Sequence, residues 1–318
     1  MKALIFEQTG NAADVLQLKD IAVPAPGPGQ LLIKVAACPV HPADFLFTQG
    51  KYRYQPQFPQ IAGLEGAGYV EAVGDGTYVP AGSLVSFFRI GAWAEYVVVD
   101  ETEVVVLPKE FPMEKAAQFQ LNPYTAWGLL LESNVKASDW LLLTAGNSTV
   151  SKILIQLAVN RGIHTIATVR NNFQIEALKQ LGADAAIVPE PGKLNEQIMQ
   201  ITGAKGIQAA VDVVGGALGT EIIGALTAQG HLIVYGLLDP NPVQYMNAQV
   251  VFKNLLIKGF GVRSFLAGLD DERKQQMING LINVMGSDSF QLSAVNYQPE
   301  QFKQAFGDSS SNKVLFNF

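Results

Sequence analysis

The chain has 318 residues, 48% of them hydrophobic, with 22 Lys and Arg against 28 Asp and Glu and a net charge of -6. This composition predicts one or two folded domains and excludes a disordered protein, a nucleic-acid binder with excess Lys and Arg, and a membrane span of about 18 apolar residues. The single cysteine, Cys38, excludes an internal disulfide and metal sites of clustered thiolates, and it indicates a reducing compartment.

The first part of the chain, up to about residue 109, shows short β-branched stretches separated by turn residues. Its beginning, MKALIFEQ, lacks the apolar region and cleavage site of a signal peptide, so we expect a first strand there and a cytoplasmic protein. The pattern predicts an antiparallel, barrel-like domain with strands at residues 3–6, 31–36, 68–73, 84–87 and 94–99.

After Met113 the pattern changes to apolar strands that alternate with helical segments, which predicts βαβ units and a parallel sheet. A complete doubly wound sheet is expected, with strands at residues 140–144, 164–169, 185–188, 209–214, 231–236 and 255–260. Helices are expected at residues 149–160, 173–181, 194–202 and 218–228. A helix over 270–285 and a strand over 313–318 follow, and we assign both to the first domain. The predicted domains are therefore residues 1–118 with 266–318, and residues 119–265.

A candidate phosphate site lies where the first strand of the predicted parallel sheet runs into a loop and a helix. The unpaired N–H groups and the dipole at a helix N-terminus attract anions. Of the three glycines in the dinucleotide-binding fingerprint G-x-G-x-x-G, only Gly146 is present, so the loop by itself is a weak signal. The alternative is an ordinary helix of a parallel sheet, with Ser148 or Thr149 as its N-cap.

Arg170 follows Gly146 by 24 residues, close to the spacing at which NAD-specific folds place an acidic residue for the ribose 2′-hydroxyl. A guanidinium there suits a 2′-phosphate, and the missing carboxylate removes the repulsion that would exclude NADP. We therefore predict NADPH as the cofactor; the alternative is a solvated arginine at a strand end. The turns at residues 213–216 and 235–237 follow later strands, at the edge where ligands of open sheets bind.

Short motifs spread over essentially the whole chain can be interpreted together. They are Ala43-Asp44, Gly50-Lys51-Tyr52, Gly63-Leu64-Glu65-Gly66-Ala67-Gly68, Asn122-Pro123-Tyr124-Thr125-Ala126, Ala145-Gly146-Asn147-Ser148-Thr149-Val150, Gly182-Ala183-Asp184 and Asp212-Val213-Val214-Gly215-Gly216. Together they resemble the medium-chain dehydrogenase/reductase superfamily, specifically its zinc-free quinone oxidoreductase and enoyl thioester reductase branches. The resemblance implies an α/β fold with a Rossmann doubly wound parallel sheet and a GroES-like, mostly antiparallel β-barrel domain.

The positions that hold zinc in metal-dependent members of this superfamily are substituted here. In those members a histidine ligand stands at the position of Leu64. The position matching the first cysteine ligand is His41, and the region of the third ligand holds Leu121-Asn122. One imidazole is not a site, because zinc needs three or four converging ligands. The resemblance therefore implies a zinc-independent enzyme, in which we expect His41 to be a structural or cleft-lining histidine and Glu65 to anchor the cleft floor by hydrogen bonds.

Without a metal, a conjugated C=C is easier to reduce than a simple carbonyl, because charge delocalises into an enolate or hydroquinone-like oxygen. Enoyl reductases are understood to use a tyrosine at this step, and Tyr52 stands at the matching position. The alternative is a tyrosine that only packs at a cleft rim. The predicted cofactor contacts, taken partly from the resemblance, are Asn122, Thr125, Asn147, Ser148, Thr149, Val150, Arg170, Asn171, Asn172, Val214, Gly215, Tyr235, Gly236, Leu237, Phe260, Gly261, Val262 and Lys313.

The sequence thus favours an NADPH-dependent, zinc-independent oxidoreductase that transfers hydride to a quinone or a conjugated carbonyl. Two alternatives stay open: a trans-2-enoyl thioester reductase, and an NADPH-binding protein of little turnover with a structural, crystallin-like or interaction role. The expected partner is a small quinone, enone or enoyl thioester, with no nucleic acid and no membrane. The last strand of the sheet, at residues 255–260, would be an apolar edge, so we predict a homodimer joined there.

Overall fold

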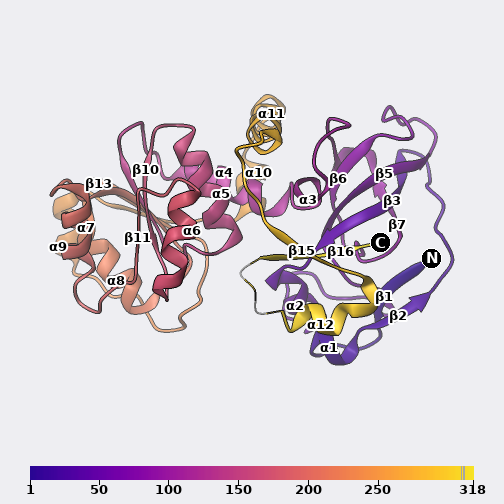
Figure 1. Cartoon of the computed structure of the whole chain (residues 1–318), viewed down its shortest axis with the longest axis horizontal. Helices are drawn as coiled ribbons and strands as arrows, with labels where there is room; N and C mark the ends of the chain where they lie inside the picture. Colours follow the sequence, from indigo (N-terminus) through magenta and orange to yellow (C-terminus); the bar gives the residue numbers. More distant parts are fainter. Residues whose placement is uncertain (309, 311) are drawn as a thin grey trace. The chain divides into compact units, whose positions relative to one another are not determined.

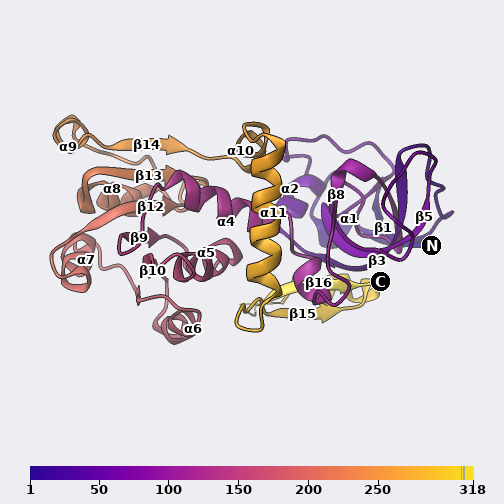
Figure 2. The ribbon, with the colours of Figure 1, turned by 90° about the horizontal axis from the view of Figure 1, so that it is seen from above.

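The computed structural model describes residues 1–308, 310 and 312–318, and the chain divides into two compact units (Figure 1). The first unit comprises Met1–Leu121 with Leu281–Phe318, and the second comprises Asn122–Gly280. Helix α11 (Asp271–Gly286), unbroken in Figure 2, carries the chain from the second unit back into the first. Residues 266–280 therefore group with the second unit. The domain boundaries predicted from the sequence stay a prediction, because compactness alone does not show which segments fold together.

Most strands of the first unit pair antiparallel, as the sequence predicts. A three-stranded sheet has the order β2-β1-β4, from β1 (Lys2–Phe6), β2 (Gln17–Asp20) and β4 (Gln60–Ile61). A seven-stranded sheet has the order β15-β16-β3-β5-β6-β8, and β7 pairs with β3 as well. Its strands are β3 (Gln30–Pro39), β5 (Glu65–Val73), β6 (Leu84–Phe88), β7 (Tyr96–Asp100), β8 (Val104–Val106), β15 (Ala294–Tyr297) and β16 (Lys313–Asn317).

The mostly antiparallel character of this unit is confirmed, but its described strands form open sheets and no closed barrel. The path of the larger sheet ends at β8 on one side and at β15 on the other, and these two strands do not pair. Short helices connect the strands: α1 (Ala12–Val15), α2 (Pro42–Thr48), α3 (Met113–Ala116) and α12 (Phe302–Phe306), with 3-10 turns at Glu101–Glu103 and Pro299–Gln301. Large side chains fill the interior, among them the fully buried Trp93, Phe47 and Phe87.

The second unit holds a six-stranded parallel sheet with the order β11-β10-β9-β12-β13-β14. Its strands are β9 (Trp140–Leu143), β10 (His164–Thr168), β11 (Ala185–Ile187), β12 (Ile207–Asp212), β13 (Leu226–Val234) and β14 (Leu256–Gly259). Counted along the chain, this is the order 3-2-1-4-5-6 of the doubly wound dinucleotide-binding fold. The predicted Rossmann sheet is therefore confirmed.

The helices between these strands lie where the apolar periodicity predicts them: α5 (Thr149–Val159), α6 (Ile175–Gln180), α7 (Leu194–Thr202) and α8 (Gly216–Ala225). In α5 the apolar stripe that includes Ile153, Leu154 and Leu157 is buried, as its three- and four-residue spacing predicts. Helix α8 ends at Ala225 instead of residue 228, because Leu226 already belongs to β13 and pairs with β12. The unit is completed by α4 (Leu121–Glu132), α9 (Asn247–Lys253) and α10 (Val262–Ala267).

None of the helices in the described part of the chain is long and apolar enough to cross a membrane.

Candidate functional site

A cavity of about 970 Å³ lies in the second unit at the carboxyl ends of its parallel strands. The segments that leave β9, β10, β12 and β13 all contribute to its wall, since the carboxyl ends of parallel strands meet at one edge of the sheet. A cavity of this size is large enough for a cofactor. The sequence prediction includes four of its lining residues: Asn147, Ser148, Arg170 and Val214. It misses several others, among them Gln174, Pro189, Pro191, Glu221, Leu238 and Asp239.

The loop after β9 brings the start of α5 to this cavity. Ser148 is the N-cap of α5. Its backbone is extended, with φ -67° and ψ 153°, and its hydroxyl accepts a hydrogen bond from Ser151 N at 3.2 Å. Gly146 lies close against β10, because its N–H donates to Thr168 O at 2.7 Å and an added Cβ would stand 2.7 Å from the Ala167 Cβ. The N-cap of α5 therefore lines the cavity, and the positive end of the helix dipole attracts an anion there.

Arg170 stands two residues after β10 and lines the same cavity with an exposed side chain. Gln174, at the end of the 3-10 turn Asn172–Gln174, lines it too. Asn171 and Asn172, which the sequence also predicts as cofactor contacts, are exposed, and within the described residues neither lines the cavity. A guanidinium and a helix N-terminus thus border one space, and both attract negative charge.

Two acidic side chains also line the cavity, and the sequence prediction includes neither. Glu221, on α8, accepts hydrogen bonds from Gly192 N at 2.9 Å and from Leu194 N at 3.0 Å. These partners precede it by 29 and 27 residues, so no local pattern could have signalled the contact. Asp239 accepts a hydrogen bond from Asn241 N at 2.9 Å. Backbone N–H groups of the chain thereby offset part of the negative charge at the cavity wall.

The turn after β12 approaches this cavity through two glycines. Val214 lines it, and Gly215 is the N-cap of α8 with a φ of 80°, in the left-handed region that favours glycine. Gly216 has a φ of 57°, and an added Cβ there would stand 2.0 Å from Asp239 Oδ2. Glycine at position 216 therefore lets the turns after β12 and β13 pack together, whereas at position 215 the backbone conformation favours glycine.

The turn after β13 lines the cavity slightly later in the chain than the sequence predicts, through Leu238 and Asp239 instead of residues 235–237. The phenol of Tyr235 contacts the two serines at the start of α5, Ser148 and Ser151. Burial raises the pKa of this phenol above its usual value, although the contacts with the serines act in the opposite direction. Tyr235, which follows β13, thus contacts the start of α5 although β12 lies between β13 and β9 in the sheet.

The remaining predicted cofactor residues of this unit lie outside the cavity wall, as far as the described residues show. They occupy the first turns of α4, the start of α5, the turn after β13 and the link from β14 to α10: Asn122, Thr125, Thr149, Val150, Gly236, Leu237, Phe260, Gly261 and Val262. Leu237 is 83% exposed, while Asn122 and Thr125 are half-buried. Their contacts with a cofactor stay predictions.

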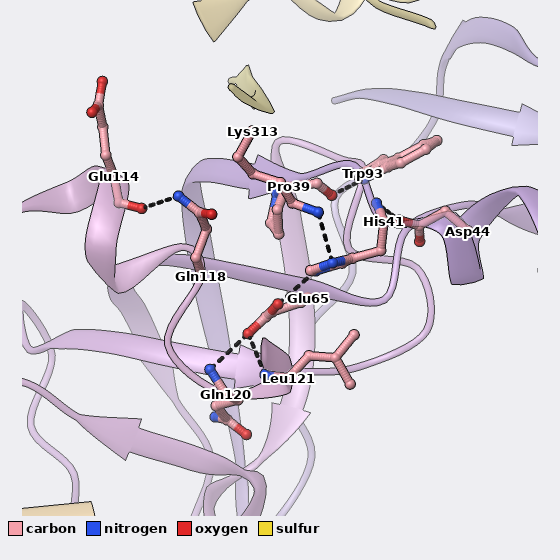
Figure 3. A network of polar contacts seen from close by, with 10 residues as sticks. All are labelled: Pro39, His41, Asp44, Glu65, Trp93, Glu114, Gln118, Gln120, Leu121 and Lys313. Carbon is pink, nitrogen blue, oxygen red and sulfur yellow. Dashed lines mark hydrogen bonds and ion pairs between the residues drawn. The ribbon is translucent and has the colours of Figure 1, made fainter. Parts of the chain in front are cut away.

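Several ionisable side chains meet inside the first unit, drawn from the start of α2, from β5 and from the start of β16 (Figure 3). Glu65 Oε1 accepts hydrogen bonds from Gln120 N at 2.7 Å and Leu121 N at 2.8 Å, and Glu65 Oε2 lies 2.7 Å from His41 Nε2. Lys313 Nζ lies 2.9 Å from His41 Nδ1. Because an ammonium group only donates, Nδ1 accepts, and the proton of the neutral imidazole is on Nε2, which donates to Glu65. This assigns Lys313, His41 and Glu65 to one hydrogen-bonded row.

Burial sets the protonation of this cluster. It lowers the pKa of His41 to about 4. The Lys313 charge also lowers this pKa, whereas the hydrogen bond to Glu65 raises it. Burial raises the pKa of Asp44 to about 7, although the bond from His41 N and the Lys313 charge oppose it. Burial also lowers the pKa of Lys313 to about 8, against the attraction of Asp44 and Glu65. At neutral pH the imidazole is therefore uncharged, and Lys313 is the cation that faces the carboxyl groups.

Tyr52, the predicted proton donor, lies in the segment after α2 and is half-buried against the core of the first unit. Its ring centroid is 5.9 Å from that of Tyr54, and the Arg53 guanidinium carbon is 5.4 Å from its ring centroid. The Tyr52 backbone N–H donates to Leu46 O at 3.1 Å. These contacts are compatible with the packing interpretation, and the catalytic role stays a prediction.

The residues at the zinc positions do not fit a zinc site. The described residues contain no group of three His, Cys, Asp or Glu side chains that could hold a metal ion. Both ring nitrogens of His41 already have partners, and Leu64 is fully buried. Cys38 is buried as well, and its thiol donates to Ala92 O at 3.0 Å. Zinc would need three or four converging N, S or O ligands, which this arrangement does not supply.

Two family models match the chain. One, described as "Zinc-binding dehydrogenase", matches residues 149–282, and the other, described as "Alcohol dehydrogenase GroES-like domain", matches residues 27–109. The second range covers β3 to β8, so the GroES-like character predicted for the first domain is confirmed.

Relatives of known name match nearly the whole chain. A mitochondrial enoyl-[acyl-carrier-protein] reductase of Xenopus tropicalis is 30% identical over 322 residues, which cover 98% of this chain and 92% of that protein. The structure of a mycobacterial quinone oxidoreductase is 27% identical, with a TM-score of 0.89 and coverage of 100% of both chains. A mycobacterial protein solved in complex with NADPH is 26% identical, with a TM-score of 0.85 and the same coverage. The chain belongs to the medium-chain dehydrogenase/reductase superfamily.

Proposed function

We propose that the protein is an NADPH-dependent oxidoreductase that reduces a quinone or a conjugated carbonyl. The observation that carries this proposal is the cavity of the second unit, because Arg170 and the N-terminus of α5 border the same space. Two anion-attracting groups at the carboxyl edge of a doubly wound sheet are what a phosphorylated dinucleotide requires. The solved relatives add support, since one is named a quinone oxidoreductase and another was solved with NADPH.

The residues present fit this cofactor. The N-terminus of α5 with its cap Ser148 would hold the pyrophosphate, and Arg170 would hold the 2′-phosphate by charge-assisted hydrogen bonds. Gly146 keeps the loop free of a side chain where it packs on β10. The sequence and the resemblance, without a cavity contact, support the other proposed cofactor residues: Asn122, Thr125, Thr149, Val150, Asn171, Asn172, Gly215, Tyr235, Gly236, Leu237, Phe260, Gly261, Val262 and Lys313.

When bound, NADPH supplies a hydride to an electron-poor double bond. The chain must then stabilise the oxygen on which negative charge develops and provide a proton. We propose Tyr52 for this role, because a phenol can donate a hydrogen bond or a proton to such an oxygen.

We also propose that the reaction needs no zinc. The support is that His41 has both nitrogens engaged and that Leu64 cannot ligate a metal. A conjugated acceptor spreads the developing charge and needs less help from a Lewis acid. We expect full activity after dialysis against a chelator. A zinc content of one ion per chain, with activity lost on its removal and regained on its return, would refute this proposal.

A trans-2-enoyl thioester reductase is the second candidate, and the sequence relatives favour it. Besides the Xenopus protein, a Caenorhabditis elegans protein of the same name is 32% identical over 270 residues. Both candidate reactions deliver hydride to the β-carbon of a conjugated system, so the same site residues serve either one.

One experiment separates the candidates. Purified protein is mixed with NADPH and, in turn, a quinone, a small enone and a trans-2-enoyl thioester, and the loss of nicotinamide absorbance is followed. Turnover of the quinone or enone supports the first proposal, and a clear preference for the thioester supports the second. Tight NADPH binding without turnover of any of the three would favour a structural or interaction protein instead.

We propose, in addition, a homodimer joined along β14. This strand is the end strand of its sheet, and its Leu256 and Ile257 are 42% and 39% exposed. On the preceding helix α9, Phe252 is 87% exposed. An apolar sheet edge is seldom left open to solvent, so a second copy is the expected cover. A monomer by light scattering would contradict this. A cytoplasmic location stays a prediction, and the two enoyl reductases named above carry the name mitochondrial.

A further inference from the structure

A fully buried carboxylate lies behind the cavity of the second unit. Asp212 is the last residue of β12 and has 0% exposure. Its Oδ1 accepts hydrogen bonds from Thr144 Oγ1 at 2.8 Å, Val214 N at 2.9 Å and Gly215 N at 3.2 Å, and its Oδ2 accepts from Gly215 N at 3.1 Å. These donors are one hydroxyl and two backbone N–H groups, so the carboxylate holds the turn that places Val214 in the cavity wall.

Thr144 extends this contact to the phosphate loop. Its hydroxyl donates to Asp212 and accepts from Val213 N at 2.9 Å. Its carbonyl accepts from Ser151 Oγ at 3.2 Å, and Ser148 Oγ donates to Ser151 Oγ at 3.0 Å. A continuous row of hydrogen bonds therefore leads from Asp212 to the N-cap of α5.

The two segments joined in this way leave different strands, β9 and β12, and pairing within the sheet does not determine how they continue beyond it. The three donors on the Asp212 carboxylate determine the relative placement of these two segments, because a charged acceptor makes stronger and more directional hydrogen bonds than a neutral one. A buried carboxylate without such donors would be costly, so the donors and the carboxylate depend on each other.

We infer that Asp212 is a positioning residue for the cofactor, which keeps the Val214 turn and the N-terminus of α5 in the relative placement that one bound dinucleotide requires. This inference rests on the proposed function, because it takes NADPH as the ligand. Asp212 does not itself line the cavity as far as the described residues show, so its effect passes through Thr144 and the turn after β12.

The test compares five variants of the full chain, four single and one double, by their affinity for NADPH, measured as the change in nicotinamide fluorescence, and by kcat and KM. Asp212→Asn keeps the shape of the side chain, but the new amide nitrogen would face an N–H donor and could not accept its hydrogen bond. We expect about ten- to a hundredfold weaker NADPH binding, with KM for NADPH raised to match and kcat within about threefold of wild type. Thr144→Val removes only the hydroxyl, and we expect about three- to tenfold weaker binding.

The controls are Thr165→Val and Asp184→Asn. Thr165 is a fully buried threonine of β10 whose hydroxyl has no partner among the described residues, so it matches Thr144 in the type and burial of the group removed. Asp184 accepts from Thr165 N at 2.9 Å at the amino end of the same sheet, away from the cavity edge. Both controls are expected to bind NADPH within about twofold of wild type, which separates positioning from general loosening of the sheet.

A double variant, Asp212→Asn with Thr144→Val, is expected to bind no more than about twofold more weakly than Asp212→Asn alone, because the two residues share one hydrogen bond. Wild-type affinity in both Thr144→Val and Asp212→Asn, or a fall in kcat with KM unchanged, overturns the inference. If Asp212→Asn does not fold, Thr144→Val alone decides between these results. Wild-type protein without NADPH affinity refutes the proposed function as well, whereas wild-type affinity in the variants refutes only the role of Asp212.

Discussion

The second unit and the first each bury carboxylates, but they satisfy them differently. In the second unit Asp212 is bound by backbone N–H groups and a hydroxyl at a sheet edge. In the first unit Glu65 and Asp44 also accept hydrogen bonds from backbone N–H groups, but they share the interior with His41 and the buried ammonium of Lys313. The first unit therefore balances its charges internally, whereas the second leaves Arg170 and a helix N-terminus at a cavity.

The contrast lies in the partners of the charged groups. The His41 cluster has the larger pKa shifts, yet its members bind one another and tie β16 to the start of α2. At the cavity of the second unit, the N-terminus of α5 and the Arg170 guanidinium provide the attraction for an anion. Three predictions can break or sharpen this comparison.

The largest effect is expected at Tyr52, which lies in the first unit but outside the charged cluster. Tyr52→Phe removes the proposed donor and should lower kcat for an enone by roughly ten- to a thousandfold, because stabilisation of the developing charge is lost. Steady-state kinetics at saturating NADPH measure this. Tyr54→Phe, in the neighbouring ring, is the matched control and should retain most of the activity. Unchanged turnover in Tyr52→Phe would remove this residue from the mechanism and leave it a packing residue.

The next effect is expected at the cavity. Arg170→Ala should weaken NADPH binding by about ten- to a hundredfold and leave NADH nearly unchanged, since one charged hydrogen bond to a phosphate contributes roughly 1.5 to 3 kcal/mol. Titration calorimetry with both dinucleotides provides the comparison. Arg89→Ala, at an exposed arginine of the first unit that pairs with Glu103, should change neither affinity. Equal weakening of NADPH and NADH in Arg170→Ala would refute the 2′-phosphate role.

The smallest effect concerns the pH dependence of stability in the His41 cluster. Because the folded pKa of His41, about 4, lies below its ordinary value of 6.5, this residue lowers stability as the pH falls from 6.5 to 4. The folded pKa of Asp44, about 7, lies above its ordinary 3.8, so this residue lowers stability as the pH rises from 3.8 to 7. The two residues therefore change the stability in opposite directions as the pH changes, and their effects should nearly cancel between pH 4 and 6.5.

Urea unfolding at several pH values, with each variant compared with wild type, tests this cancellation. Asp44→Asn should show stability that decreases toward acid, and His41→Gln stability that decreases toward neutral pH. Each slope should approach about a tenfold change in the folding constant per pH unit, the value for one proton. Parallel pH curves for wild type and both variants would show that these groups do not titrate as described.

The sequence predicts the parallel sheet and its helices well because their periodicity is local. In α5, for example, the spacing of Ile153, Leu154 and Leu157 is enough to predict both the helix and its buried face. Short strands such as β2 and β4 escape prediction, since four and two residues carry too little pattern and form only by pairing with β1. The barrel expected from the antiparallel pattern is likewise absent from the described strands, because closure depends on which edges pair.

Some residues of the candidate site could likewise be predicted from the sequence, and others could not. Gly146, Ser148 and Arg170 follow strand ends that the sequence predicts, so their place at one sheet edge could be inferred from the chain alone. Glu221 could not be assigned a role in this way, because its hydrogen-bond partners lie on another loop. For Asp212, the contact that the sequence does not reveal is the hydrogen bond from Thr144, 68 residues earlier.

By itself, then, the sequence determined the doubly wound sheet and most of its helices and strands, because short-range periodicity and turn chemistry govern them. It also indicated the sheet edge at which we propose that a phosphate binds. The tertiary structure alone decided the tautomer of His41, the partner of Lys313 and the hydrogen bond from Thr144 to Asp212. Each of these depends on side chains that are distant in sequence and come together only when the strands pair and bury them.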